Sequence, residues 1–345
     1  MEKLYYKGID YGKIVCAILV VCIHTGPLLS INKEMNFFLV QIVARIAVPF
    51  FFIASAFFFF RKLHYEDGLR ATKNIELLKK YVLRLCKMYL LWSLLYLTIQ
   101  IPMWIYHGFS FHTLLLYARD FLFMGSYYHL WFLPSLIFAV LFVYFLLERI
   151  NIKKVLILSL ILYIIGMFIN VYGDFFTHVP LVSNLLDIYL IVFATARNGL
   201  FFGCIFVSLG YLIAKHESNF IEFKRSGVIS FLISFALLIG EAYLIRSLHM
   251  MNDLTSMYLM LIPCVYFLFC TLLSYKNDRP NSNFVRNSST LLYFSHCYII
   301  FFVGLIPFFK MNSILYFVIV MLLSMAFIYG FFEASKKFKI LRGML

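Results

Sequence analysis

The chain contains repeated runs of about 20 predominantly apolar residues, separated by short polar stretches. A run of this length crosses the hydrocarbon core of a bilayer as an α-helix, because a helix satisfies its backbone hydrogen bonds internally. Hydrophobic residues make up 63% of the 345 positions and charged residues only 13%, which is more apolar surface than a soluble fold can bury. The sequence therefore predicts an all-α polytopic membrane protein.

The hydropathy pattern predicts about ten transmembrane helices. They are expected at residues 9–31, 37–60, 81–106, 130–148, 155–173, 190–214, 227–246, 254–275, 288–309 and 313–334. A shorter apolar piece, 111–124, is expected to be an interfacial or re-entrant helix. The longest polar stretches, 61–80 and 276–288, are too short for a core of their own, so we expect a single membrane domain over residues 1–345.

The distribution of positive charge predicts the orientation of the helices and explains the net charge of +14. If the N-terminus is cytoplasmic, most Lys and Arg residues outside the spans fall on the cytoplasmic side, and only Lys33, Arg119, Arg246 and Lys310 fall on the other. We therefore expect cytoplasmic N- and C-termini and a multi-pass protein of the bacterial plasma membrane. Membrane lipid, and not nucleic acid, is the expected partner.

The seven cysteines lie in or beside apolar segments and show no metal-ligand spacing, so they are expected to be small buried side chains without disulfides or metal. The sequence has no G-x-S-x-G, H-E-x-x-H or Walker A motif, and nothing in it is suited to seat pyridoxal phosphate. Candidate functional residues are therefore the ionisable groups inside the spans, which are costly in lipid.

The first apolar stretch carries a cation at its start, Lys13, and a histidine further in, His24. Eleven residues are about three helical turns, so both side chains lie on one face, about 16 Å apart along the axis. Lys13 is expected at the cytoplasmic edge and His24 in the outer half of the membrane. A ligand with an anionic end and a reactive end would fit along this face. The alternative is a snorkelling lysine and a histidine bonded to a neighbouring helix.

Three further charged residues, Arg45, Arg197 and Glu241, are expected at about the depth of His24. They form either a structural ion-pair network or a site in which Glu241 or an arginine orients His24, or in which the arginines bind an anion. His296, in the ninth predicted span, is either a helix-packing group or a site residue.

Two groups near the membrane surfaces also have two readings. The stretch SYYHLWFLP places His129 with Tyr128 and Trp131 at the outer interface, as an aromatic belt or as a substrate-facing group. The spacing of Lys80, Arg84 and Lys87 forms one basic stripe at the start of the third span. This stripe is either a set of snorkelling side chains or a phosphate seat.

The ordered motifs of the chain resemble the acyltransferase-3 family. Asp10-Tyr11-Gly12-Lys13, ten residues and His24 resemble the family's D-x-x-R and histidine pattern. The stretches RIAVPFFFIASAFFF, YHLWFLP, RNGLFFG and LLYFSH are similar to family patterns in the same order. The resemblance covers nearly the whole chain.

The resemblance implies a membrane acyltransferase that takes an acyl group, usually acetyl, from cytoplasmic acyl-coenzyme A and delivers it to an extracytoplasmic hydroxyl. It implies acyl-coenzyme A as co-substrate, with no metal. His24 matches the family's essential histidine, and Arg84 matches the first arginine of its R-x-x-R motif. Lys13 and Lys87 stand where the family has arginine, which keeps the charge but loses bidentate phosphate binding.

Within that family, KGIDYGKIVCAILVVCIH and RIAVPFFF most resemble the membrane half of the membrane-bound serine racemases of vancomycin resistance. That resemblance implies a C-terminal cytoplasmic racemase domain as a partner, with racemase activity not expected from this chain alone. It also implies serine uptake as an alternative function. The basic tail KKFKILRGML is compatible with the natural end of a chain and with a cut edge before a further domain.

Two mechanisms follow from these residues, and a passive anchor for a racemase domain is a third reading. For acyl transfer, the donor phosphates would bind Lys13, Arg84, Lys87 and Lys80, and His24 would act as general base. Arg45 or Arg197 would stabilise the oxyanion. For transport, an arginine would bind the carboxylate of serine and Glu241 its amine.

Overall fold

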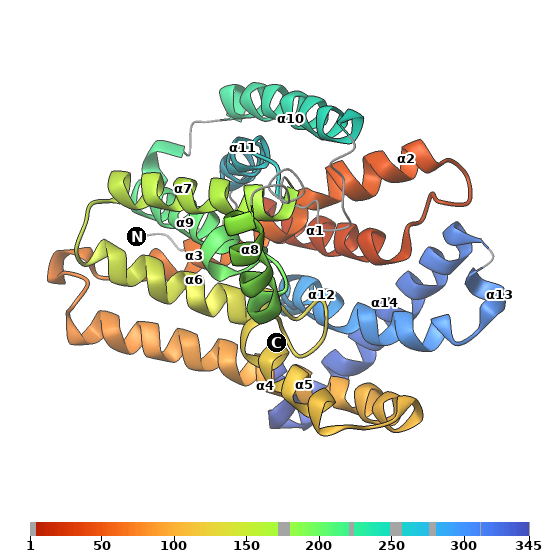
Figure 1. The fold of residues 1–345 in the computed structure, drawn as a ribbon. Coiled ribbons are helices and arrows are strands. Elements are labelled where there is room, and N and C mark those ends of the chain that lie inside the picture. Colours follow the sequence, from red (N-terminus) through yellow and green to blue (C-terminus); the bar gives the residue numbers. More distant parts are fainter. Residues whose placement is uncertain are drawn as a thin grey trace. The chain divides into compact units, whose positions relative to one another are not determined.

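The computed structural model describes residues 5–171, 180–220, 224–248, 257–275, 281–310 and 312–344 (Figure 1). Within these ranges the chain is helical and contains no β-strand, which confirms the predicted all-α class. The helices are α1 (Lys7–Thr25), α2 (Lys33–Phe37), α3 (Ala47–Phe60), α4 (Thr72–His107), α5 (Phe111–Phe123), α6 (Phe132–Leu147), α7 (Ile152–Val171), α8 (Pro180–Phe193), α9 (Cys204–Lys215), α10 (Lys224–Ser247), α11 (Leu261–Leu273), α12 (Asn283–Gly304), α13 (Pro307–Lys310) and α14 (Ser313–Lys337).

Six helical segments in the described ranges are long and apolar enough to cross a membrane. They are Lys7–Thr25, Lys33–Phe60, Thr72–His107, Ile152–Val171, Arg225–Ser247 and Ser313–Lys337. Shorter apolar helices are Phe132–Leu147, Asn184–Phe193, Gly199–Lys215 and Leu261–Leu273. The length and apolar composition of these helices indicate a multi-pass membrane protein. The number of spans and the side of the membrane on which each terminus lies stay predictions.

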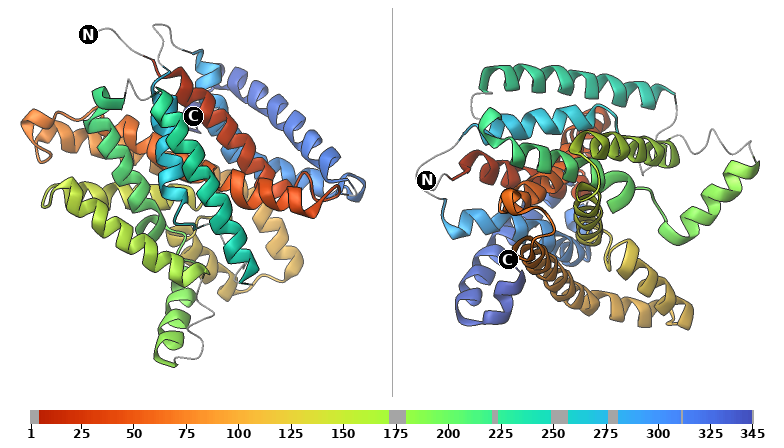
Figure 2. Two further views of the ribbon diagram at one scale, coloured as in Figure 1. Left: turned by 90° about the horizontal axis from the view of Figure 1, so that it is seen from above. Right: turned by 90° about the vertical axis from the view of Figure 1, so that its left-hand side faces the viewer.

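The sixth predicted span, 190–214, is the clearest departure from the sequence-based expectation. Helix α8 ends at Phe193, and Ala194 adopts a left-handed backbone with φ of 51°. Asn198 then begins a π-helical segment, Gly199–Gly203, by accepting hydrogen bonds from the N–H groups of Leu200 and Phe201 at 3.0 and 3.1 Å. Figure 2 shows that α8 and α9 run in different directions on either side of this break.

Asn170 of α7 stabilises the break from outside. Its Oδ1 accepts hydrogen bonds from the N–H of Ala196 at 2.9 Å and from the Thr195 hydroxyl at 3.2 Å. Non-helical backbone at membrane depth needs such partners, since lipid supplies none. The hydropathy window could not detect the break, because apolar residues continue on both sides of it.

Helix α4 is longer than its predicted span, 81–106, because the polar residues before it are also helical. It runs unbroken from Thr72 to His107 and has Pro102 near its C-terminal end. Helix α5, by contrast, coincides with the predicted short helix at 111–124 and is capped by Ser110, whose hydroxyl accepts from the Thr113 N–H at 3.2 Å.

The contacts divide the chain into two compact units that alternate along the sequence. The first comprises Met1–Phe51, Glu217–Ala242 and Pro263–Leu345, and the second comprises Phe52–His216 and Tyr243–Ile262. In the first unit, α12 packs against both α1 and α14. Gly8 lets the start of α1 approach α11, because a Cβ atom at this position would lie 2.3 Å from the Leu272 carbonyl oxygen.

In the second unit, α6 packs on the π-helical segment Gly199–Gly203 and on α9, and α7 packs on α9. Aromatic rings fill the space between them. Phe52 contacts Phe132 edge-on at 4.9 Å between ring centroids and also contacts Phe202 at 5.9 Å. These edge-to-face contacts give the interior of the unit a fixed geometry as well as apolar contact area.

The turn between α3 and α4 is held by one buried side chain, Asn74. Its Nδ2 donates to the carbonyl oxygens of His64 at 2.9 Å and Gly68 at 2.8 Å, and its Oδ1 accepts from the His64 N–H at 2.9 Å. Tyr65 in the same turn donates its hydroxyl to the Phe60 carbonyl at 2.9 Å. Burial raises the pKa of the Tyr65 phenol further above neutral pH, and its hydroxyl is a donor in this turn.

We expect Asn74→Ala to destabilise the protein by about 1–3 kcal/mol, because it leaves buried backbone groups of the turn without their partners. The measurement is the thermal unfolding midpoint of the detergent-solubilised protein, which should fall. Lys73→Ala is the control, because the Lys73 side chain is 74% exposed and forms only a surface ion pair with Asp67 at 3.8 Å. Equal midpoints for the two variants would contradict this role of Asn74.

A second prediction concerns Gly125, which has φ of 89° and lies in close contact with the backbone of Trp131. A Cβ atom there would lie 2.3 Å from the Trp131 backbone nitrogen, so Gly125→Ala must displace the turn that carries His129. Gly108→Ala is a matched control, because Gly108 has the same φ but nothing within 4 Å of its Cβ position. We expect only Gly125→Ala to change the tryptophan fluorescence spectrum. A spectral change of the same size in Gly108→Ala would contradict the close contact.

Candidate functional site

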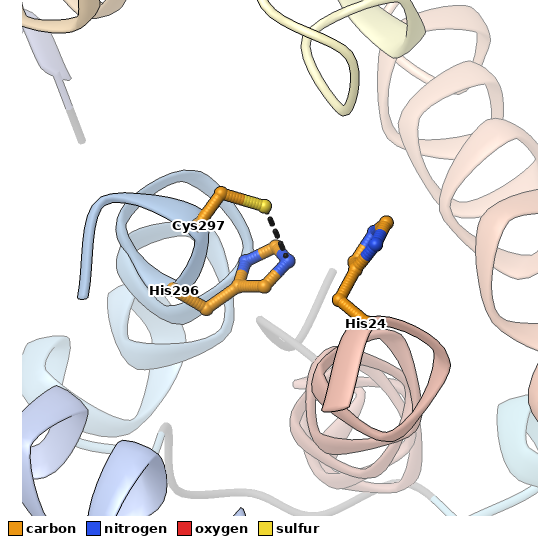
Figure 3. Close-up of side chains that lie close together, drawn as sticks. All are labelled: His24, His296 and Cys297. Carbon is orange, nitrogen blue, oxygen red and sulfur yellow. Dashed lines mark hydrogen bonds between the residues drawn. The ribbon is translucent and has the colours of Figure 1, made fainter. Parts of the chain in front are cut away.

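His24 lies in the last turn of α1, where it faces a second histidine. Figure 3 shows the His24 ring lying beside the ring of His296, with Cys297 next to His296 on α12. The two imidazole centroids are 5.2 Å apart and their planes are tilted by 31°. His296 is fully buried and Cys297 is 1% exposed, whereas His24 is half-buried. The packing of α1 on α12 therefore brings together two side chains from opposite ends of the sequence.

The hydrogen bonds of His296 define its tautomer. Nδ1 lies 3.1 Å from the Leu292 carbonyl oxygen, which can only accept, so Nδ1 carries the proton. In the neutral ring Nε2 is then an acceptor, and the Cys297 thiol donates to it at 3.1 Å. The atoms of His24, His296 and Cys297 that could bind a metal ion, an imidazole nitrogen of each histidine and the cysteine Sγ, lie within 4.8 Å of one another.

The N-terminal part of α1 carries the other polar group of this helix. Lys13 Nζ lies 3.0 Å from Asp10 Oδ1, and the Asn281 amide donates to Asp10 Oδ2 at 3.1 Å. The Tyr6 hydroxyl donates to the carboxylate of Glu217. Lys13 therefore lies beside a carboxylate that offsets its charge, and this carboxylate, Asp10, is in the first turn of the helix.

Arg45 and Glu241 belong to the same unit as His24. Arg45 lies in a short 3₁₀ segment, Ala44–Ile46, that follows a π-helical segment, Phe38–Val43. Its guanidinium donates to Gln41 Oε1, from Nε at 3.1 Å and also from Nη2. Glu241 is half-buried on α10. The π-helical segment changes the direction of the Arg45 side chain, a local feature that apolar periodicity does not reveal.

The predicted outer-interface group lies in the second unit and forms an aromatic cluster. His129 is 2% exposed and packs edge-on against Tyr96, with ring centroids 5.0 Å apart. Tyr127 and Tyr128 lie 5.8 and 5.7 Å from the same imidazole. Tyr128 is 50% exposed, so it is the member of this cluster that can meet a ligand from outside.

Arg197 joins this aromatic group and not the His24 unit. Its guanidinium carbon lies 4.9 Å from the ring centroid of Trp131, a cation–π contact. Arg197 is held there by the break after α8, and its N–H donates to the Thr195 hydroxyl at 3.1 Å. The irregular backbone thus places Arg197 against Trp131 of the SYYHLWFLP stretch.

The basic stripe lies on the continuous helix α4. Lys80, Arg84 and Lys87 are all exposed. Lys80 pairs weakly with Glu76 at 3.9 Å, and the Arg84 guanidinium lies 5.8 Å from the Tyr81 ring centroid. Their common face follows from the helix, while the role of phosphate seat stays a prediction.

The structure thus places the predicted residues in two groups, one in each unit. The first contains Asp10, Lys13, His24, His296, Arg45 and Glu241, and the second contains Lys80, Arg84, Lys87, Tyr128, His129, Trp131 and Arg197. Sequence reasoning missed Cys297 as a site residue, as well as the partners Asn281 and Gln41. Cys297 directly follows His296, but only the pairing of α1 with α12 shows that both face His24.

Three curated relatives share the sequence over most of this chain. Two amino-acid racemases of Enterococcus faecalis are 34% identical over 79% of this chain and 29% identical over 92% of it. A serine/alanine racemase of Enterococcus gallinarum is 30% identical over 93% of it. The matches cover only 37–45% of those relatives, so the chain spans less than half of their length. No solved structure matches the chain.

The family comparison covers the residues that carry the candidate site. The acyltransferase-3 family, described as an acyltransferase domain, matches residues 6–333, which include α1 with His24 and α12 with His296. The match confirms the resemblance inferred from the ordered motifs. Because the family match spans nearly the whole chain, the chain belongs to the acyltransferase-3 family.

Proposed function

We propose that the chain transfers an acyl group, most simply acetyl, from acyl-coenzyme A to a hydroxyl acceptor, with His24 as general base. The observation that carries the proposal is the half-buried imidazole of His24 beside the buried His296, within an acyltransferase domain. A positioned imidazole can accept a hydroxyl proton near neutral pH.

The reaction joins the acceptor oxygen to the carbonyl carbon of the thioester. His24 takes the hydroxyl proton as the oxygen attacks, and the tetrahedral intermediate carries a negative oxygen. When the carbon–sulfur bond breaks, the proton passes from His24 to the departing coenzyme A thiolate. The products are an ester and free coenzyme A, with no net change in protons.

The charged side chains have proposed roles in binding. In the unit that contains His24, Lys13 is proposed to bind the phosphates of the donor and Arg45 to stabilise the oxyanion. In the other unit, the exposed stripe of Lys80, Arg84 and Lys87 is proposed to be a phosphate-binding surface of its own. The exposed ring of Tyr128, next to His129 and Trp131, is proposed to contact the acceptor. The chain alone is not proposed to racemise amino acids, and no pyridoxal phosphate or metal enters the transfer step.

For orientation, we propose about ten spans in the bacterial plasma membrane with both termini in the cytoplasm, so that the donor enters from inside. The asymmetry of Lys and Arg between the two sides supports this arrangement. In the proposed orientation, the basic turn between α3 and α4 is on the cytoplasmic side, and the turn between α4 and α5 is on the extracytoplasmic side.

The orientation predicts different labelling of two exposed positions, Lys62 and Phe109. In a cysteine-free background, Phe109→Cys should react with a membrane-impermeant maleimide in intact cells, and Lys62→Cys should react only after permeabilisation. Permeabilised cells, in which both variants react, are the control. Labelling of Lys62→Cys in intact cells would invert the proposed topology.

The transfer mechanism predicts that His24→Ala lowers acyl transfer at least about 100-fold, because a general base contributes about 10²–10⁴-fold. The measurement uses inside-out membrane vesicles given radiolabelled acetyl-coenzyme A, and follows label reaching the lumenal material. His112→Ala is the control, since His112 is an exposed histidine of α5 outside the cluster. A normal rate in His24→Ala would exclude His24 as the base.

A second candidate function is serine uptake for a racemase domain, and the racemase names of the curated relatives support the racemase part of this alternative. Within the first unit, the serine carboxylate would bind Arg45 and its amine would bind Glu241. A cytoplasmic racemase domain following the membrane domain is part of this alternative.

Proteoliposomes containing the purified chain separate the two functions. Saturable uptake of radiolabelled serine without coenzyme A, together with no acyl transfer, would favour transport. Acyl transfer without serine uptake is the result that we expect. Protein-free liposomes measure the leak of serine.

A further inference from the structure

We propose that His24, His296 and Cys297 form a binding site for a divalent transition-metal ion of the zinc type. The proposal rests on the side-chain cluster itself and does not depend on the acyl-transfer function. The sequence alone predicts no metal site, because its ligands come from α1 and α12 and show no short spacing.

The distances suit a metal of this size. The ligand atoms of the three residues lie within 4.8 Å of one another, and Cys297 Sγ is 3.1 Å from His296 Nε2. In a tetrahedral zinc site with bonds of about 2.0–2.3 Å, neighbouring ligand atoms are about 3.3–3.6 Å apart. A shift of the order of an ångström, within reach of the half-buried His24 side chain, would bring all three into coordination.

The chemistry of the ligands selects the class of metal. Two imidazoles and a thiolate favour zinc, cobalt or copper over magnesium and calcium, which prefer oxygen ligands. The lone pair of His296 Nε2 already points at the thiol, and the Leu292 carbonyl fixes the other nitrogen as the proton-bearing one. A carbonyl in this place orients a metal-binding histidine.

Metal binding would replace the hydrogen bond between Cys297 and His296. The Cys297 thiol loses its proton to solvent, its sulfur and the two imidazole nitrogens bind the ion, and both rings stay neutral. The oxidation states of sulfur and metal do not change. Three protein ligands leave a fourth position for water or another molecule, which is the arrangement of an open site.

The site has two fixed ligands and one accessible ligand. His296 and Cys297 are buried on α12, which packs against α1 and α14, whereas His24 retains exposure at the end of α1. An ion would therefore be bound last by His24. If His24 is the general base, which rests on the proposed function, a bound ion occupies the lone pair that accepts the proton and inhibits transfer.

Cobalt(II) is the probe for the test, because thiolate ligation gives a sulfur-to-cobalt charge-transfer band in the near ultraviolet. The purified full chain, reduced with a phosphine, is titrated with Co²⁺ in detergent. We expect one equivalent to produce the band, and zinc to abolish it by competition. Absence of the band in the folded protein would overturn the proposal.

Variants then assign the ligands. Cys297→Ser should lose the band, and His24→Ala and His296→Ala should each weaken Co²⁺ binding at least about 10-fold, as loss of one ligand implies. Cys204→Ser is the matched control, because Cys204 is an equally buried helical cysteine in the other unit. The band persisting in Cys297→Ser, or lost in Cys204→Ser, would overturn the assignment.

Two further measurements make the result independent of folding and of the enzyme reaction. The unfolding midpoint of each variant without metal shows whether a lost band reflects a lost fold, and His24→Gln offers a milder change at the accessible ligand. Neither the band nor the affinity requires acyl donor or acceptor. A band in a protein that transfers no acyl group would support the metal site and contradict only the proposed function.

Discussion

The constraint on which this structure depends is that lipid offers no hydrogen bonds to the backbone. Every N–H and C=O group at membrane depth must find a partner within the protein, which makes helices the default and makes each interruption informative. The interruption after α8 shows the rule: Asn170 and Asn198 supply, from side chains, the partners that a regular helix would have supplied. A backbone conformation at Ala194 that costs free energy is thus accompanied by side-chain hydrogen bonds made by two asparagines, Asn170 and Asn198.

Both candidate arginines lie beside such irregular segments. Arg45 follows the π-helical segment Phe38–Val43, and Arg197 precedes the segment Gly199–Gly203. A π-helical turn adds a residue to the turn and so rotates the side chains after it. Because a charged side chain must avoid lipid, a local change of helical phase is one way to direct it toward polar or aromatic partners, here Gln41 and Trp131.

The helical class of the fold could be predicted from the length of the apolar runs, because a bilayer requires helices of about this length. The short helix at 111–124 and the helical class were predicted in this way. The break at 194–198 was not, since its cause is the distant amide of Asn170 and not the local hydropathy. The candidate site was predictable to the level of single residues: the Lys13 and His24 spacing identified one helical face, and the pairing with His296 and Cys297 required knowing which helix packs against α1.

The ion pair of Lys13 with Asp10 shows why the spacing of two residues along a helix does not by itself define a binding site. Eleven residues separate Lys13 from His24 on one face, which suits a long donor with phosphates at one end. Yet the Lys13 ammonium lies 3.0 Å from Asp10, whose second oxygen accepts from Asn281. An anionic ligand at Lys13 must therefore compete with a carboxylate already present, or share the cation with it. Asp10 lies in the first turn of α1, where the helix dipole favours negative charge, so it has a structural reason to be there apart from any ligand. Net attraction for donor phosphates at this end of the helix must consequently come from cations beyond Lys13.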